Sequence, residues 1–333
     1  MLDGGLILVI IIILVALIFD FGNGVNDAAN AVSTVVATGV LSLRAAVLMS
    51  AFFNFAGAFV FGVAVAKTIG KGIIDSNLVT PYVVLASLCG AIFWVYLMTR
   101  KGFPISVSHS LIGGLVGVGL AKAGLKSIIY SGVTKVVIFI FVAPLLGLVG
   151  AMLFSAIVFH FSRNSDPRKV NKHFRWLQLI SASVYSLGHG TNDAQKTMGI
   201  IAILLFSAGY LSGEFYVPFW IVLLSHGTIA LGTLIGGRKV IHTMGHKITK
   251  LRPVNGFCAE TAGASVIIGA TQFGIPVSTT HVIAGSIMGV GAAKRVSAVR
   301  WGVANKILWS WILTIPVSAA VAALSYLVIS LFI

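Results

Sequence analysis

Five apolar runs dominate this sequence, and each approaches or exceeds the length that crosses a lipid bilayer. A membrane-spanning helix needs about 20 predominantly apolar residues. Only 9% of the residues are charged, against about 25% in ordinary soluble domains, so a water-exposed surface cannot be built from this chain. We expect an all-α, polytopic protein integral to the plasma (inner) membrane, with the lipid bilayer as its surroundings. The runs are Leu6 to Phe19, Ala45 to Ala66, Val133 to His160, Val217 to Ile235 and Ile307 to Ile333.

The basic residues gather in two connections between apolar runs. The formal net charge of +15 would by itself suit a nucleic-acid partner, but Lys and Arg do not line one helix face. Basic clusters between spans are typical of cytoplasmic loops, so we expect no nucleic-acid partner and two membrane crossings between these connections. The first connection holds Arg163, Arg168, Lys169, Lys172 and Arg175, and the second holds Arg238, Lys239, Lys247, Lys250 and Arg252.

An internal duplication organises the chain. The segment Gly22–Asn30 resembles Gly188–Lys196, and Pro104–Lys122 resembles Pro276–Lys294 with nine of nineteen positions identical. Both pairs recur in the same order, which is the signature of a repeat. Because the first copy starts without basic residues and the second starts beside a basic loop, we expect inverted repeats with both termini outside. The predicted units are a first transmembrane repeat, 1–160, a basic cytoplasmic linker, 161–175, and a second transmembrane repeat, 176–333.

Two Asn-Asp pairs, Asn26-Asp27 and Asn192-Asp193, occupy equivalent places in the copies. A carboxylate at membrane depth costs at least about 2.5 to 3.5 kcal/mol, so an intramembrane acid is a functional candidate. Its oxygens suit a small hard cation, or it can carry a proton. The alternative is that each Asp caps a broken half-helix. Interruptions at matching places in two halves predict a central binding site.

The second repeated motif, Pro-x-Ser-x-Ser/Thr-His, combines a helix-stopping proline with hydroxyls. A helix that starts here would present free N–H groups and a positive dipole end to an anion. Two such ends that face each other would hold a tetrahedral anion, and the glycines that follow would let the helix pack closely. The alternative is that the hydroxyls only satisfy helix backbone. The hydroxyl residues are Ser106, Ser108, Ser278, Thr279 and Thr280.

Several other ionisable side chains fall within apolar sequence. Lys196 stands where the first copy has Asn30, and we expect it to pair with Asp193 or to act as a fixed positive charge rather than reach the membrane surface. Histidines can shuttle protons or simply pack, and Glu260 is a candidate gate or proton site. The histidine candidates are His109, His281, His189 and His226, and weaker acidic or amide candidates are Asp20 and Asn54.

At these residues the sequence resembles the inorganic phosphate transporter family. Its duplicated Gly-x-Asn-Asp motif is similar to Gly24–Asp27 and Gly190–Asp193, and its hairpin motif is similar to Pro276–His281. The resemblance implies inorganic phosphate as substrate, symport with a cation, and inverted repeats with broken helices and two re-entrant hairpins. Carried over by position, Asp27, Asp193 and Asn30 would hold the coupling cation, and Ser106, Ser108, Ser278, Thr279, Thr280, Asn26, Asn192 and Lys196 would bind the substrate.

Lys196 is where this chain departs from the family pattern, because sodium-coupled members have Asn there. A fixed ammonium can stand in for one sodium ion. We therefore expect import coupled to protons, with a divalent metal–phosphate complex as one form of the substrate, while sodium coupling stays open. No cofactor is expected beyond the coupling ion, H⁺ or Na⁺, and a homo-oligomer is compatible with the sequence.

Two other functions remain to be weighed. A permease for sulfate or another tetrahedral oxyanion would use the same hydroxyl and N–H groups. An intramembrane enzyme is not expected, because the sequence has no His-Glu-x-x-His or Gly-x-Ser-x-Gly motif and catalysis does not call for a duplicated site. Cys89 and Cys258 lie far apart in apolar sequence, so we expect neither a disulfide framework nor a resident metal.

Overall fold

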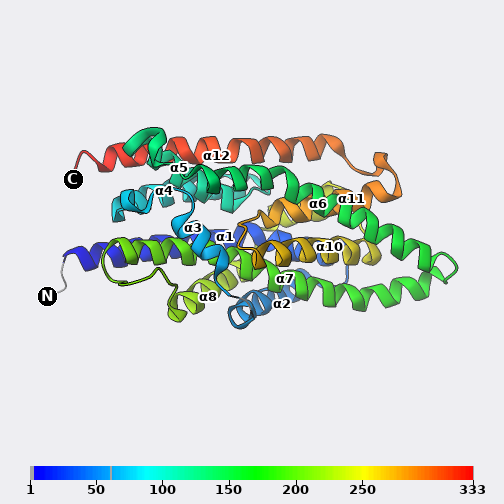
Figure 1. Cartoon of the computed structure of the whole chain (residues 1–333). Coiled ribbons are helices and arrows are strands. Elements are labelled where there is room, and N and C mark those ends of the chain that lie inside the picture. The colour runs from blue at the N-terminus through cyan, green and yellow to red at the C-terminus, as the bar shows by residue number, and fades with distance from the viewer. Residues whose placement is uncertain (1–3, 61, 333) are drawn as a thin grey trace.

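The computed structural model describes residues 4–60 and 62–332; residues 1–3, 61 and 333, which belong to the predicted repeats, lie outside the described residues. The described chain is an elongated bundle of helices (Figure 1), which confirms the all-α prediction. The helices are α1 (Gly4–Ala37), α2 (Leu43–Ala56), α3 (Ala64–Lys71), α4 (Pro81–Lys101), α5 (Val107–Ala123), α6 (Tyr130–Ser162), α7 (Pro167–Ser207), α8 (Phe219–Ile235), α9 (Arg238–His242), α10 (Pro253–Gln272), α11 (Thr279–Lys294) and α12 (Trp301–Ile329).

Four of these helices, α1, α4, α6 and α12, are long and apolar enough to cross a membrane. Two bent pairs, α2 with α3 and α8 with the segment Arg238–Lys247, raise the number to six within residues 4–60 and 62–332. The long helix α7 has 41 residues, which at 1.5 Å per residue is about 60 Å. The chain is therefore an integral, multi-pass membrane protein.

Two hairpins enter the bundle from opposite ends. In Figure 1, α4 and α5 lie toward the end that carries both termini, whereas α10 and α11 lie toward the end with the α6–α7 connection. The residue that precedes each second helix has nearly the same backbone angles: φ −88° and ψ 105° at Ser106, φ −84° and ψ 109° at Ser278. Matching hairpins with opposite entry are what inverted repeats produce, so the predicted hairpins and their inversion are confirmed.

Each hairpin packs on the last long helix of the other repeat. Helix α5 lies along α12, and α11 lies along α6. Glycine makes these approaches close: a Cβ added at Gly285 would lie 2.2 Å from the Pro144 carbonyl oxygen, and one added at Gly117 would lie 2.1 Å from that of Ala319. The expected glycine packing is therefore present, and it interleaves the two repeats.

The variant Gly285→Ala is expected to lose stability, because α6 and α11 must separate to admit the methyl group. Overpacking of this kind costs typically about 1–3 kcal/mol. The control is Gly227→Ala in α8, where an added Cβ meets nothing within 4 Å. Thermal unfolding in detergent should give a lower Tm for Gly285→Ala only, and equal Tm values would contradict the packing.

The two Asn-Asp motifs do not interrupt their helices, in contrast to our expectation. Helices α1 and α7 run without a break through Asp27 and Asp193. Alanine follows each motif and favours the helix, and the polar side chains bond to other helices instead of competing for their own backbone. The breaks lie at the hairpin turns and bent pairs, so neither Asp lies at a helix end and neither acts as a cap.

Most of the predicted basic linker is helical. Only residues 163–166 separate α6 from α7. The second helix starts early because Asp166 accepts a hydrogen bond from the Arg168 N–H at 2.8 Å and Pro167 occupies the first helical position; both features favour a helix start. The basic residues that follow extend α7 beyond its apolar part.

The two basic connections lie at the same end of the bundle. Arg175 Nη2 donates to the Gly39 carbonyl oxygen at 2.9 Å, just past the end of α1. In the second connection, Gly245 packs against Ala37 at the end of α1. The positive-inside rule requires this shared end, because both connections were assigned to the cytoplasm.

Candidate functional site

A line of buried polar side chains runs along one face of α1. Successive members are three or four residues apart, a spacing that places them on the same helix face. Each is at most 2% exposed. Polar groups at membrane depth are costly and mark functional positions, so this face is the starting point for the site. The residues are Asp20, Asn23, Asp27, Asn30 and Thr34.

Asp27 and Asp193 meet at the start of α11. Thr279 Oγ1 lies 3.0 Å from Asp193 Oδ2, to which it donates, and 3.5 Å from Asp27 Oδ2. Thr280 Oγ1 donates to Asp27 Oδ1 at 3.2 Å, and Asn30 Nδ2 donates to Thr280 Oγ1 at 2.9 Å. Residues from α1, α7 and α11 therefore converge on one centre, which we call the Asp27–Asp193 centre.

Lys196 lies inside the protein and pairs with Asp193. Its side chain is 1% exposed. The ammonium bonds to Asp193 Oδ1 one turn earlier on α7 and donates to the Val277 carbonyl oxygen at 3.1 Å. The side chain therefore does not reach the membrane surface, and it balances the negative charge of Asp193.

His189 approaches the other oxygen of the same carboxylate. Its Nε2 lies 3.2 Å from Asp193 Oδ2, and its Nδ1 lies 3.1 Å from Asn54 Oδ1. Asn54 in turn donates from Nδ2 to Thr233 Oγ1 at 2.9 Å, while His226 Nδ1 donates to the Asn54 backbone oxygen at 2.7 Å. Of these residues, only His189 touches the centre.

Three buried side chains of the centre have the chemistry to hold a metal ion. Asp27, His189 and Asp193 each place one ligand atom within 4.8 Å of the others. Carboxylate oxygens and an imidazole nitrogen suit a divalent transition metal or zinc. We expected no resident metal. This geometry is instead relevant to a metal ion that would enter the site together with the substrate.

The two hairpin helices start beside each other. His109 and His281, each near the start of its helix, have ring centroids 4.8 Å apart, and the His281 ring stacks on Trp311 at 3.8 Å. These histidines pack on each other and make no hydrogen bond to the Asp27–Asp193 centre among the described residues. Their contact nevertheless brings two positive helix ends together, the arrangement expected for an anion site.

The motif hydroxyls divide into two groups. Ser106 and Ser278 each accept a hydrogen bond from the backbone N–H of the following histidine at 3.2 Å, so they cap their helices, which was the alternative interpretation. Thr279 and Thr280 face the carboxylates. Ser108 is buried and makes no side-chain hydrogen bond to the centre among the described residues.

Asn26 and Asn192 turn away from the centre toward partners that our sequence analysis missed. Asn26 Nδ2 donates to Thr99 Oγ1 at 2.7 Å, and Asn192 Nδ2 donates to Thr271 Oγ1 at 2.8 Å. The two threonines precede the two hairpin turns by equal distances. That repeat offset was a signal that could have identified them.

Glu260 lies in a separate buried cluster. Its Oε1 accepts from Thr34 Oγ1 at 2.6 Å and from Gln178 Nε2 at 2.9 Å, and its Oε2 accepts from Ser181 Oγ. Thr34 is seven residues after Asp27, which along a helix is about 10 Å. Glu260 therefore lies beyond the centre, toward the end with the basic connections.

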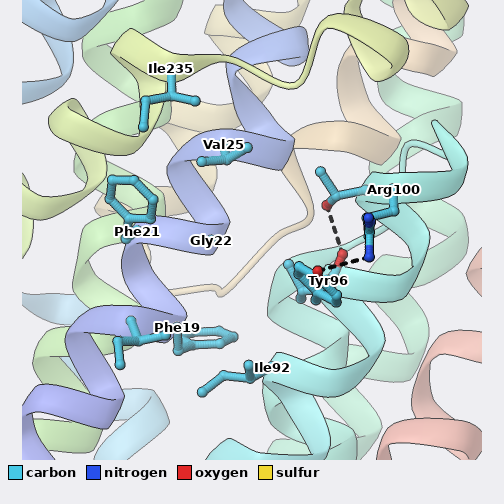
Figure 2. A pocket seen from close by; sticks show the side chains of 11 residues that line it. Phe19, Phe21, Gly22, Val25, Ile92, Tyr96, Arg100 and Ile235 are labelled. Carbon is cyan, nitrogen blue, oxygen red and sulfur yellow. Dashed lines mark hydrogen bonds between the residues drawn. The ribbon is translucent and has the colours of Figure 1, made fainter.

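The pocket shown in Figure 2 is not part of this site. It lies between α1, α4 and the end of α8, and mainly apolar side chains line it, among them Phe19, Ile92 and Ile235. Gly22 and Val25 line it from α1, on the face opposite Asp20 and Asp27. An apolar lining cannot replace the hydration of a small anion.

Known proteins resemble the chain over nearly its full length. Residues 23–322 match the Phosphate transporter family. A protein from Rhizobium meliloti named "Probable low-affinity inorganic phosphate transporter" is 56% identical over 95% of this chain and 94% of its own. One of the same name from Bacillus subtilis is 42% identical over 98% of both. A solved structure titled "The sodium-dependent phosphate transporter" has a TM-score of 0.88 at 29% identity and covers 98% of this chain and 100% of its own.

Proposed function

The chain belongs to the phosphate transporter family, and we propose that it is a secondary active transporter that imports inorganic phosphate by symport with protons. The proposal uses the buried Asp27–Asp193 centre as the coupling site and the two hairpin starts as the phosphate site. Another tetrahedral oxyanion, sulfate, is the alternative substrate that the test must distinguish.

The ion pair of Lys196 with Asp193 is the reason why we propose protons and not sodium as the coupling ion. The solved relative at 29% identity is titled a sodium-dependent transporter. In this chain an ammonium already bonds to Asp193 inside the bundle, so the carboxylate is less available to a metal cation. Among the described residues, the hydrogen-bond donors to Asp27 are the hydroxyls of Thr279 and Thr280, and a proton can bind there without a set of six oxygen ligands.

The phosphate site rests on the paired helix starts. The first N–H groups of α5 and α11 have no partner in their own helices, and both helix dipoles are positive at this end. Ser106, Ser108 and Ser278 add hydroxyl donors in the same region, and Lys196 adds a positive charge. Thr279 and Thr280 would add theirs on turning from the carboxylates to which they now donate. An anion with several acceptor oxygens matches this set of donors.

A metal–phosphate complex is a natural form of the substrate here. Asp27 and His189 would contact the metal, and the hairpin starts would hold the phosphate. Asp193 would complete the metal site after Lys196 releases its carboxylate. Repacking of the helices would then expose the centre to one membrane face and the other in turn. Because the hairpins pack on helices of the other repeat, the moving bodies mix both repeats instead of following the 1–160 and 176–333 division.

Uptake of radiolabelled phosphate into proteoliposomes tests this function. We expect uptake when an inward proton gradient is imposed and none above background with a sodium gradient alone. Unlabelled sulfate should not compete, and addition of Mg²⁺ or a chelator tests the metal–phosphate form. Sodium-driven uptake would overturn the role of Lys196, and competition by sulfate would assign the protein to the other oxyanion.

A further inference from the structure

We infer that Asp20, together with Asn23 and Thr197, forms a second proton-binding site that is separate from the Asp27–Asp193 centre. The inference rests on the proposed proton-coupled transport and adds a residue to its proton path. Asp20 is seven residues before Asp27 on the same face of α1, which corresponds to about 10 Å along the helix axis. It therefore lies between the centre and the end of the bundle that carries both termini.

The contacts of Asp20 leave one carboxyl oxygen free. The side chain is 0% exposed, and its Oδ1 accepts a hydrogen bond from Thr197 Oγ1 at 2.8 Å. Its Oδ2 has no hydrogen-bond partner within residues 4–60 and 62–332, and neither has Asn23 Oδ1. Residues three apart on a helix are neighbours, so the Asn23 side chain lies next to the Asp20 carboxyl group.

A single proton would satisfy both unpartnered oxygens, Asp20 Oδ2 and Asn23 Oδ1. An ionised carboxylate with one hydrogen bond at membrane depth is energetically costly. A proton on Oδ2 removes the charge and supplies an O–H donor, for which Asn23 Oδ1 is a ready acceptor. A metal cation would need about six oxygen ligands, and the pair offers two free ones.

The electrostatic surroundings keep this site distinct from the centre. Of the helices that pack against α1, α7 is the one that brings charged groups close to Asp20 among the described residues, namely Asp193 and Lys196. These two bond to each other, so their effects on Asp20 oppose each other. Within the part of the chain that the structure describes, Asp20 forms no ion pair of its own, which favours exchange of a proton over a permanent ion pair.

Infrared difference spectroscopy on the protein in liposomes tests the site without any transport measurement. A pH titration should show the C=O band of a protonated carboxylic acid that disappears in Asp20→Asn and persists in the control Asp166→Asn, which changes an exposed acid in the α6–α7 connection. Thr197→Val removes the hydrogen bond that stabilises the ionised form, so the midpoint of the band should move upward by about 1–2 pH units. An unchanged band in Asp20→Asn, or an unmoved midpoint in Thr197→Val, would overturn the site.

Transport by the same variants links the site to coupling. Asp20→Asn should lose accumulation driven by a proton gradient, whereas Asp20→Glu, which keeps the carboxyl group, should retain it. Accumulation by Asp20→Asn equal to that of the unmodified protein would refute a role in coupling. If Asp20→Asn does not give folded protein by gel filtration, the shift of the C=O band midpoint in Thr197→Val decides whether the proton site exists. Failure of the unmodified protein to take up phosphate, with the titrating band present, would reject the proposed function and leave the proton site standing.

Discussion

The variant Lys196→Met is expected to abolish proton-driven phosphate uptake and to destabilise the protein by about 3–5 kcal/mol, the usual cost when one partner of a buried ion pair is removed. The reason is that Asp193 would keep its charge at 1% exposure, with His189 and the Thr279 hydroxyl as its remaining partners among the described residues. Thermal unfolding in detergent measures the stability, and proteoliposome uptake measures the function.

Two further variants make the Lys196 prediction specific. The double variant Lys196→Met with Asp193→Asn should recover most of the lost stability, because no unpaired charge is left, but it should not recover uptake. Lys172→Met, an exposed lysine on the same helix, should behave like the unmodified protein. Normal uptake by Lys196→Met would show that the ammonium is structural and that the coupling argument is mistaken.

Asp27→Asn should reduce phosphate uptake to background while the fold is preserved. The amide has nearly the same shape, and its oxygen can still accept from Thr280. Asp27 forms no ion pair among the described residues, so the neutral amide leaves no partner charge unpaired. What is lost is a carboxylate that can take up a proton or bind a metal at the centre. Uptake and Tm are measured on the same preparation.

The matched control for this variant is Asp166→Asn, the same chemical change at an exposed position in the α6–α7 connection. It should leave uptake unchanged. If Asp27→Asn retained uptake with normal insertion in the membrane, the carboxylate would be needed only for packing, and the coupling site would have to lie elsewhere.

Residue patterns were sufficient for the elements that depend on local composition. Apolar runs predicted membrane helices, the repeated Pro-x-Ser motif located both hairpin turns, and glycines after each motif predicted close packing. The Asn-Asp motifs were harder, because Asn and Asp favour caps and turns in isolation. In the bundle their side chains find partners on other helices, so α1 and α7 continue through Asp27 and Asp193.

The partners of the site residues could not be derived in the same way. Thr99 and Thr271 satisfy Asn26 and Asn192, yet threonine in a membrane helix carries no distinctive signal by itself. Asp20 appeared only as a weak candidate, because its unpartnered oxygen becomes visible only once the surrounding helices are in place.

By itself, the sequence determined that this protein lies in the membrane, that it is built from two related repeats, and that the Asn-Asp and Pro-x-Ser motifs place polar side chains at membrane depth. These properties follow from the local cost of placing charge in lipid and from direct comparison of segments. Tertiary structure alone decided which side chains meet, for example Asp27 with Thr280, 253 positions apart, and that each hairpin packs on the other repeat. The physical reason is that hydrogen bonds and ion pairs act over a few ångströms, so their partners are set by the packing of helices that are distant in the chain.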